Sequence, residues 1–376
     1  MASHPVSRAP TRMNQLSFPY MFWARHKSQR TNHPLSQSGM PTASPEALQL
    51  APDPAADLEH PMLYGERLEA RISEHLDVAP EQVIVTAGAT GALHLAAASF
   101  FPDSHVVTEL PSYNPFLALA QLYARSNTPV QRHLEEGFGL SIEAVERALY
   151  ARRPKAHLFL CNPHNPTGVC LSKDTMIALA ERAQGTEGVL IACETYMEFA
   201  PPGERDYIAK LSPNGVSLGS LTKAYGLGPL RIGWMCLGEG LVQRRKQILD
   251  RLYLSAVDVP TSALRAGLRA FERLETLSEP ILGVEETRRL FAEWMETEER
   301  IEGILPRYSI AAFPKVHGIE DTESFSEYLC ENHDVDVIPG ECFSMPGHLR
   351  IGFGIPRSTL ERGLEKLSAG IRSYRE

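Results

Sequence analysis

Short apolar segments of strand length alternate with helical segments along the first two thirds of the chain, and this alternation constrains the fold more than any other feature. Runs of consecutive apolar residues, without an apolar–polar alternation, are typical of strands covered on both faces. We expect such strands at 105–110, 156–163, 188–196, 215–223 and 231–238, with an earlier one that begins at Val83. Strands separated by helices, such as 141–152 and 173–184, pair in parallel. The pattern predicts an α/β fold in three layers around a mostly parallel sheet.

The pattern changes beyond about residue 240. Long helical stretches at 241–254 and 280–305 are followed by short apolar segments that alternate with helices. This indicates a second, smaller α/β domain, and 376 residues are enough for two domains. We predict three parts: an N-terminal arm (1–50) that joins the small domain, a large domain (51–255), and a small C-terminal domain (256–376).

The N-terminus carries an unusual charge bias. The first 45 residues contain five Lys or Arg residues, and Glu46 is the first acid. A transit peptide has this character. The apolar run "LSFPYMFWA" (16–24) favours the alternative that the segment folds onto the body as an arm, and it is too short for a secretory signal.

Composition excludes several classes of function. A net charge of −9 argues against general nucleic-acid binding, and no apolar run approaches the roughly 20 residues that cross a membrane. The six cysteines have neither metal-ligand spacing nor the density of a disulfide framework, so we expect a cytoplasmic protein.

Ligands of an open parallel sheet bind at the carboxyl ends of its strands, so the residues that follow each strand are candidate site residues. In "TAGATGAL" (86–93), Ala89 and Thr90 open a helix whose free amides favour a phosphate, although a tight turn explains the glycines equally well. The dinucleotide motif is absent, because Leu93 stands where its last glycine would fall. In "ELPSYNPF" (109–116), Tyr113 is placed to stack on a planar ring or to pack in the core.

Two further strand ends offer polar groups. In "CNPHNPTG" (161–168), the Asn-Pro pairs force a turn that presents the amide of Asn165. In "ACETYMEF" (192–199), alternation puts Cys193 on one face and Glu194 on the other, and Tyr196 is free to turn toward a site if the strand ends near residue 194.

The stretch "SLTKAYGLGPLRIGW" (220–234) places Lys223 among small and apolar residues, with Ser220 before it and Arg231 after it. A poorly hydrated lysine loses its proton more easily and can form a Schiff base, whereas a Gly-rich surface loop with two incidental cations is the alternative. Arg350 lies in the apolar segment "GHLRIGFG" (347–354), where it needs a carboxylate, supplied by a ligand or by an internal salt bridge. Its neighbour His348 is a specificity candidate, although a solvated strand-end histidine is the simpler interpretation.

Together these groups describe one task. They can hold a phosphate, stack on a flat ring, hydrogen-bond a ring oxygen, form an imine through a lysine and clamp a carboxylate. That combination is the chemistry of a pyridoxal 5'-phosphate site for an amino acid.

On these motifs the chain resembles the class I/II aminotransferase family of fold-type I pyridoxal phosphate enzymes, from about residue 35 to the C-terminus. The resemblance implies that Lys223 and Tyr196 are the catalytic residues, with Lys223 forming the internal aldimine and shuttling the substrate proton. It implies that the other cofactor-binding residues are Ala89, Thr90, Tyr113, Asn165, Cys193, Tyr196, Ser220 and Arg231. It further implies a homodimer that takes an α-amino acid and a 2-oxo acid, with Asn165 and Arg350 at the substrate. Gly39 resembles the family's N-terminal substrate-side glycine, and Tyr64 its tyrosine lent across the dimer.

Cys193 departs from the family pattern. The family has an aspartate there, whose carboxylate keeps the pyridine nitrogen protonated. A thiol, with an ordinary pKa of about 8.5, is a poor counter-ion unless the pyridinium stabilises its thiolate. The leading hypothesis is therefore an aminotransferase. The alternatives are a lyase, racemase or replacement enzyme on the same scaffold, or a degenerate pyridoxal phosphate-binding protein.

Overall fold

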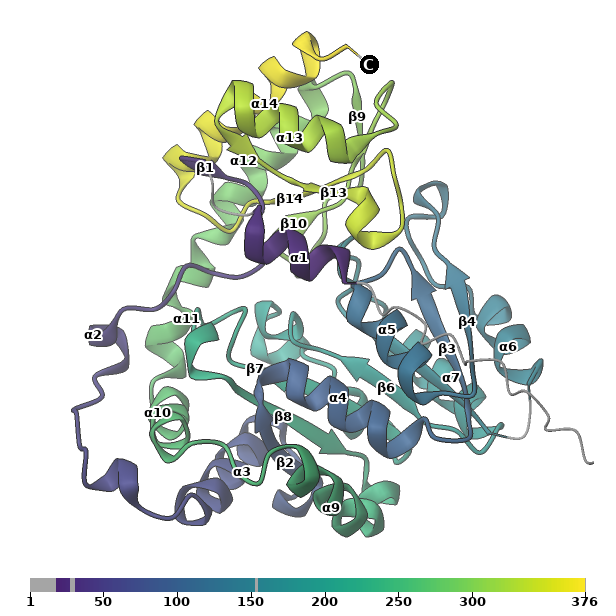
Figure 1. Cartoon of the computed structure of the whole chain (residues 1–376), viewed down its shortest axis with the longest axis vertical. Coiled ribbons are helices and arrows are strands. Elements are labelled where there is room, and N and C mark those ends of the chain that lie inside the picture. The colour runs from purple at the N-terminus through teal and green to yellow at the C-terminus, as the bar shows by residue number, and fades with distance from the viewer. Residues whose placement is uncertain (1–17, 28–30, 153–154, 376) are drawn as a thin grey trace, which may run out of the picture.

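A seven-stranded sheet forms the centre of the computed structural model, which describes residues 18–27, 31–152 and 155–375 (Figure 1). The strand order is β2-β8-β7-β6-β5-β3-β4. The strands are β2 (Val83–Ala87), β3 (His105–Leu110), β4 (Ser126–Gln131), β5 (Ala156–Cys161), β6 (Leu190–Cys193), β7 (Gly215–Ser220) and β8 (Ile232–Leu237). Strand β8 is antiparallel to β2 and β7, and the other pairs are parallel. The predicted α/β class with a mostly parallel sheet is confirmed.

Helices cover both faces of this sheet, because its strands are apolar on both sides. On β5, Phe159 belongs to one apolar cluster with α4 and α5, whereas Leu158 belongs to another with α6 and α7. The covering helices are α3 (Met62–Leu76), α4 (Gly88–Phe100), α5 (Asn114–Tyr123), α6 (Ile142–Tyr150), α7 (Lys173–Gln184), α8 (Ile208–Leu211), α9 (Arg245–Ser255) and α10 (Thr261–Glu272). Ser141 caps α6 through its hydroxyl, as its position before the helix predicts.

The C-terminal part contains smaller sheets flanked by helices. A three-stranded antiparallel sheet has the order β10-β14-β13, and β9 pairs with β11. The strands are β9 (Ile301–Glu302), β10 (Ala311–Ala312), β11 (Lys315–Val316), β12 (Val335–Asp336), β13 (Ile338–Pro339) and β14 (Leu349–Gly352). The helices are α11 (Leu274–Leu282), α12 (Val284–Thr297), α13 (Thr322–His333) and α14 (Arg357–Ser373). The helical stretch expected to reach residue 305 therefore ends at Thr297.

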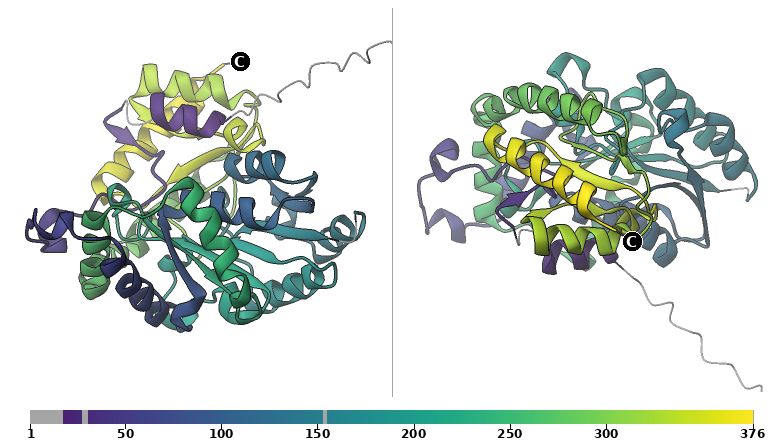
Figure 2. Two further views of the ribbon diagram at one scale, coloured as in Figure 1. Left: turned by 60° about the horizontal axis from the view of Figure 1, so that its bottom comes forward. Right: turned by 90° about the horizontal axis from the view of Figure 1, so that it is seen from above.

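The N-terminal segment lies against this C-terminal part. Helix α1 (Pro19–His26) packs on the 3-10 helix η8 (Gly340–Phe343), and β1 (His33–Pro34) pairs with β12 (Figures 1 and 2). The chain then passes through α2 (Pro45–Leu48) to α3. The remaining 3-10 helices are η1 (Ala56–Leu58), η2 (Pro80–Gln82), η3 (Leu134–Glu136), η4 (Met197–Phe199), η5 (Pro202–Glu204), η6 (Gly228–Leu230) and η7 (Glu239–Arg244).

Two predictions about chain organisation remain predictions. The transit-peptide alternative concerns the first 45 residues, of which 1–17 and 28–30 lie outside the described part of the chain. The domain boundaries at 50 and 255 also remain predictions, and α10, which follows residue 255, packs on α3 and β8. Within the described residues, no helix combines the length and the apolar character that crossing a bilayer requires.

Candidate active site

An anion-binding site is formed where β2 passes into α4. Gly88 has φ +72°, and a Cβ atom at this position would lie 2.3 Å from Nη2 of Arg231. Ser220 ends β7 opposite Gly233, whose backbone packs against Gly88. The predicted phosphate residues, Ser220, Arg231 and the first turn of α4, are therefore brought together at a helix N-terminus with free amides.

Lys223 lies next to the chain segment that precedes α2. Its Nζ donates a hydrogen bond to Oγ of Ser38 over 2.8 Å, and its carbonyl accepts one from the amide of Met40. A Cβ atom on Gly39 would sit 3.3 Å from both Cα and Cδ of Lys223, so glycine allows this close approach. Burial lowers the pKa of Lys223, and the charge of Arg350 lowers it further. A lysine with a lowered pKa is the nucleophile that imine formation needs.

Arg350, on β14, points toward the same region and is 1% exposed. Its Nη1 donates to Oδ1 of Asn165 over 3.0 Å, and its Nη2 donates to Oη of Tyr20 over 3.2 Å and to the carbonyl of Ser36 over 3.4 Å. Its Nε has no partner. Within the described residues Arg350 forms no salt bridge, so the alternative of an internal ion pair is not observed. A buried guanidinium of this kind is suited to a bound carboxylate.

Two tyrosine side chains that the sequence predicts for the site lie near Arg350. Tyr113 immediately precedes α5, and its ring meets Tyr20 edge-on with centroids 5.1 Å apart. Tyr196 follows the end of β6, as predicted, and stacks on Phe199 with centroids 6.2 Å apart. Burial raises the pKa of Tyr113 and of Tyr196, so both phenols stay protonated and act as hydrogen-bond donors at neutral pH.

Two thiols lie side by side at the ends of β5 and β6. Cys161 and Cys193 are register partners, and both belong to the apolar cluster on the face that α4 and α5 cover. The Cys193 thiol is also 3.3 Å from Oγ1 of Thr195. Hydrogen bonding from Cys161 lowers the pKa of Cys193, with smaller contributions from Thr195 and Lys223, against the opposing effect of burial.

Glu194 does not substitute for an aspartate at position 193. Its Oε1 accepts a hydrogen bond from the amide of Ile208 at the start of α8, over 2.9 Å, on the opposite face of the sheet. Burial raises its pKa to about 8. The face that carries Cys193 therefore has a thiol where the family pattern has a carboxylate.

Two predicted side chains lie outside this cluster in the single chain. The hydroxyl of Tyr64 donates to Glu59 over 2.5 Å, so its predicted role in a neighbouring subunit's site stays a prediction. His348 is buried and stacks on Phe313 with centroids 5.1 Å apart. The interpretation of His348 as a solvated histidine is wrong, because the strand end is covered by aromatic side chains.

Sequence patterns missed two residues of the cluster. Tyr20 belongs to an apolar run that predicts packing alone, and Ser38 lies next to Gly39 outside any recognised motif. The only sequence signal for Ser38 was this adjacency. For Tyr20 no local signal exists, because Arg350, its partner, is 330 residues away along the chain.

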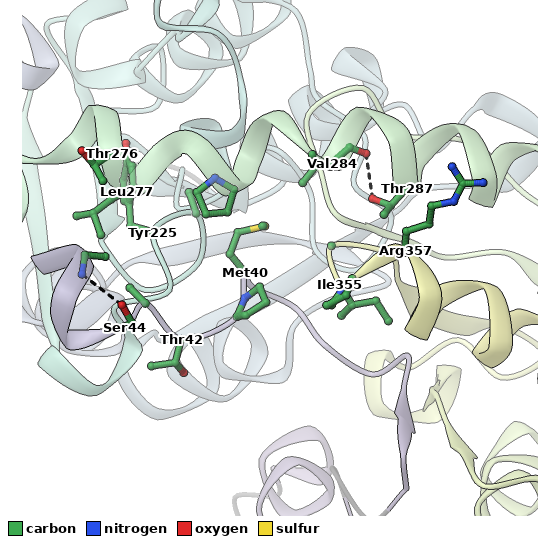
Figure 3. A pocket seen from close by; sticks show the side chains of 18 of the residues that line it. Met40, Thr42, Ser44, Tyr225, Thr276, Leu277, Val284, Thr287, Ile355 and Arg357 are labelled. Carbon is green, nitrogen blue, oxygen red and sulfur yellow. Dashed lines mark hydrogen bonds between the residues drawn. The ribbon is translucent and has the colours of Figure 1, made fainter.

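A separate cavity of about 480 Å³ borders the cluster (Figure 3). It lies between the segment after Gly39, α11, α12 and the start of α14. Met40, Ala224 and Tyr225 are among its lining residues, whereas Lys223 and Arg350 are not. The cavity thus flanks the segment that carries Lys223 without containing the reactive groups.

The donor set fits pyridoxal phosphate. Gly88 leaves room for the Arg231 guanidinium beside the amides of the α4 N-terminus, which together suit a phosphate. Lys223 supplies an amine of lowered pKa. The Nε of Arg350 has no hydrogen-bond partner and can donate to a carboxylate. The fold and these groups define the class as pyridoxal phosphate-dependent enzymes of fold type I. The sequence profile of the family "Aminotransferase class I and II" matches residues 56–367, and the chain belongs to this family.

Relatives within the family differ in the activity that their names state. The chain is 30% identical to capreomycidine synthase of Streptomyces vinaceus over 324 residues, which are 84% of this chain and 81% of that protein. It is 26% identical to an aspartate aminotransferase of Sulfurisphaera tokodaii, over 82% of this chain and 81% of the relative.

Solved structures show the same fold. A pyridoxal phosphate-dependent aminotransferase from Streptococcus suis superposes with a TM-score of 0.84 at 22% identity, over 96% of this chain and 99% of the other. The pyridoxal phosphate-dependent cyclase OrfR superposes with a TM-score of 0.78 at 24% identity, over 97% and 99% of the two chains.

Proposed function

We propose that this chain is an aminotransferase that moves an amino group from a small α-amino acid to a 2-oxo acid. When bound, pyridoxal phosphate supplies an aldehyde that captures amines and a ring that accepts electrons from the substrate α-carbon. Lys223 would hold the cofactor covalently and, once released, carry the proton between the α-carbon and the cofactor. Ser220, Arg231 and the α4 amides would hold the phosphate, and Asn165 and Tyr196 would hydrogen-bond the ring oxygen.

One observation carries this proposal: a single short segment contacts both cations that the reaction needs. The Ser38 hydroxyl accepts a hydrogen bond from Lys223, and the Ser36 carbonyl accepts one from Arg350. The amine that would react and the guanidinium that would bind the carboxylate therefore both contact the segment from Ser36 to Ser38. An α-amino acid carries its amine and its carboxylate on one carbon, and this segment contacts one group suited to each of them.

The test is to mix the purified protein with pyridoxal phosphate and a panel of amino acids, one at a time and without a 2-oxo acid. An aminotransferase converts its bound cofactor to pyridoxamine phosphate and releases the 2-oxo acid of its donor, in equal amounts. Addition of a 2-oxo acid then restores the pyridoxal form. Absence of the pyridoxamine form with every amino acid would refute amino transfer.

A second candidate is a lyase, racemase or replacement reaction, including ring closure within one substrate. Cys193 favours it, because a thiol stabilises a protonated ring nitrogen less well than a carboxylate and full transamination depends strongly on that protonation. Similarity to capreomycidine synthase and to the cyclase OrfR points the same way. In the panel above, these reactions change the amino acid while the cofactor returns to the pyridoxal form. A degenerate binding protein would bind the cofactor and change no amino acid.

We also propose a cytoplasmic homodimer. Several large apolar side chains on η1, on α3 and at the end of α9 are more than half exposed, and a second copy could cover them. These are Leu58, Met62, Leu63, Tyr253 and Leu254. In the described structure the six cysteines form no disulfide, which is consistent with a reducing compartment. Size measurement in solution tests the dimer, since a monomer at micromolar concentration would exclude it.

A further inference from the structure

Tyr20 lies beside the guanidinium that the proposed function assigns to the substrate carboxylate. We propose that Tyr20 is a residue of the carboxylate subsite: its hydroxyl accepts a hydrogen bond from Arg350 before substrate binds and then donates one to the carboxylate. This inference rests on the proposed function, because it requires Arg350 to receive a carboxylate. It adds a group from the N-terminal helix that no sequence motif indicated.

The position of Tyr20 is fixed by contacts at both ends of the residue. Its amide donates to Oδ1 of Asn114 on α5 over 3.0 Å, and its hydroxyl accepts from Nη2 of Arg350 over 3.2 Å. The centre of its ring is also 5.1 Å from the guanidinium carbon. Helix α1 therefore connects α5 to β14 through Tyr20.

The hydrogen-bond acceptors of Arg350 include no carboxylate. Its other acceptors are the amide oxygen of Asn165 and the carbonyl of Ser36, which are both neutral. Within the described residues no carboxylate pairs with it, and a buried unpaired guanidinium is costly. The Tyr20 phenol is the one hydrogen-bond partner of Arg350 that can become an anion.

The positive charges near Tyr20 favour loss of its phenolic proton. The groups that face it come from the elements packed against its helix. The charged and titratable groups among them are Arg350 of β14, Lys223 after β7, Tyr113 before α5 and Tyr196 after β6, and the Ser38 hydroxyl is a further hydrogen-bond partner. Burial raises the pKa of Tyr20, but the charges of Arg350 and Lys223 outweigh burial and lower it to about 8.

A linkage between proton and carboxylate follows. Below its pKa, the phenol is neutral and can donate to a carboxylate held by Arg350. Above its pKa, the phenolate already neutralises Arg350 and repels a second anion. Carboxylate binding should therefore take up a proton at Tyr20, and affinity should fall by about tenfold for each pH unit above the pKa.

The experiment uses the full chain loaded with pyridoxal phosphate and 3-phenylpropionate as the carboxylate probe, with 3-phenylpropionamide as the uncharged control. Calorimetric titrations in two buffers of different ionisation enthalpy count the protons taken up. They extend from neutral to alkaline pH, because cofactor binding changes the charge at Lys223 that helps to lower the pKa of Tyr20. The near-ultraviolet absorbance of phenolate, which is separate from the visible band of the cofactor, follows Tyr20 in the same samples.

Tyr20→Phe keeps the ring and removes the hydroxyl, so the core contacts of α1 remain. We expect this variant to lose the proton uptake, the phenolate signal and the decline of affinity at high pH. The matched control is Tyr123→Phe, which removes a hydroxyl that contacts His94 on the surface and should leave all three unchanged. Identical pH dependence of probe affinity in wild type and Tyr20→Phe would overturn the proposal.

Failure of the proposed function gives a different result. The probe titration requires binding only, so it can show the Tyr20 linkage in a protein that transfers no amino group. Conversely, a protein that transfers amino groups normally but shows no proton uptake with the probe would retain the proposed function and refute the role of Tyr20.

Discussion

The Tyr225 hydroxyl donates a hydrogen bond to the buried Glu198 carboxylate over 2.5 Å. Tyr225 is two residues after Lys223, and Glu198 is two residues after Tyr196, so this contact ties together the two segments that carry these site residues. The same carboxylate accepts from Tyr207 over 2.6 Å and pairs with Arg205 over 2.9 Å. This network does not include the reactive groups. It holds together the two chain segments that carry Tyr196 and Lys223.

Replacing this carboxylate should destabilise the fold. Glu198→Gln removes the charge of a buried carboxylate and leaves the partly buried Arg205 without its ionic partner, so we expect a loss of about 3 kcal/mol in the free energy of unfolding. Chemical denaturation measures it. The control is Glu296→Gln on the exposed surface of α12, which should change stability by less than about 0.5 kcal/mol. Equal stability of the two variants would contradict the supporting role of Glu198.

The Glu198 carboxylate should also make the stability of the fold depend on pH in acid. Burial raises the pKa of Glu198, but hydrogen bonds and charges from His75, Arg205 and Tyr207 outweigh burial and lower it to about 2. A pKa lowered by folding stabilises the protein above the ordinary value of about 4.5, and this stabilisation is lost as pH falls toward 2. Its size is about 3 kcal/mol. In denaturation curves from pH 6 to 2, Glu198→Gln should lose less stability on acidification than the wild type, and a parallel loss would contradict the assignment.

Exchange of the thiol at the end of β6 tests its effect on the reaction. Cys193→Asp restores the carboxylate of the family pattern, and we expect amino transfer to rise by about tenfold if the missing counter-ion limits the rate. The rate of formation of the pyridoxamine form measures it, and Cys193→Ser, which is similar in size and neutral, is the control. A decrease, or an equal change in both variants, would mean that the site is tuned to the thiol.

Removal of the guanidinium should discriminate between substrates. Arg350→Ala should lower kcat/KM by about thirtyfold or more for α-amino acids, since truncation of one partner in a buried charge pair costs about 2–5 kcal/mol. Amines without a carboxylate should lose far less. Arg350→Lys, which keeps the charge but not the fork, is expected to lie between these limits. Equal losses for both substrate types would instead indicate a purely structural role.

Much of the fold is predictable from the sequence because the buried strands are strongly apolar. The run at 105–110 forms β3 with the same bounds, and the strand expected at 156–163 ends at Cys161, where two prolines follow within five residues. Strand β4 escaped prediction. It is polar and contains Pro129, and it forms an edge of the sheet, where a residue without an amide hydrogen is tolerated.

The sequence predicts the residues of the candidate site only where they belong to a local motif. Lys223 and Arg231 lie in one motif, and Gly88 marks a turn with positive φ beside Arg231. Tyr20 and Ser38 come close to Arg350 and Lys223 only through tertiary folding. No spacing in the sequence encodes such a contact, and the thiol pair at the ends of β5 and β6 depends likewise on strand register.

The central claim is that the amine of Lys223 holds pyridoxal phosphate. The direct measurement is the visible spectrum of the protein with this cofactor, followed by borohydride reduction and mass mapping of the adduct. Wild type should show a visible band and a reduced adduct at Lys223. Lys210→Ala, at an exposed lysine that pairs with Asp77, should match it, whereas Lys223→Ala should lose both signals. An unchanged spectrum in Lys223→Ala, or an adduct at another lysine in the wild type, would contradict the account.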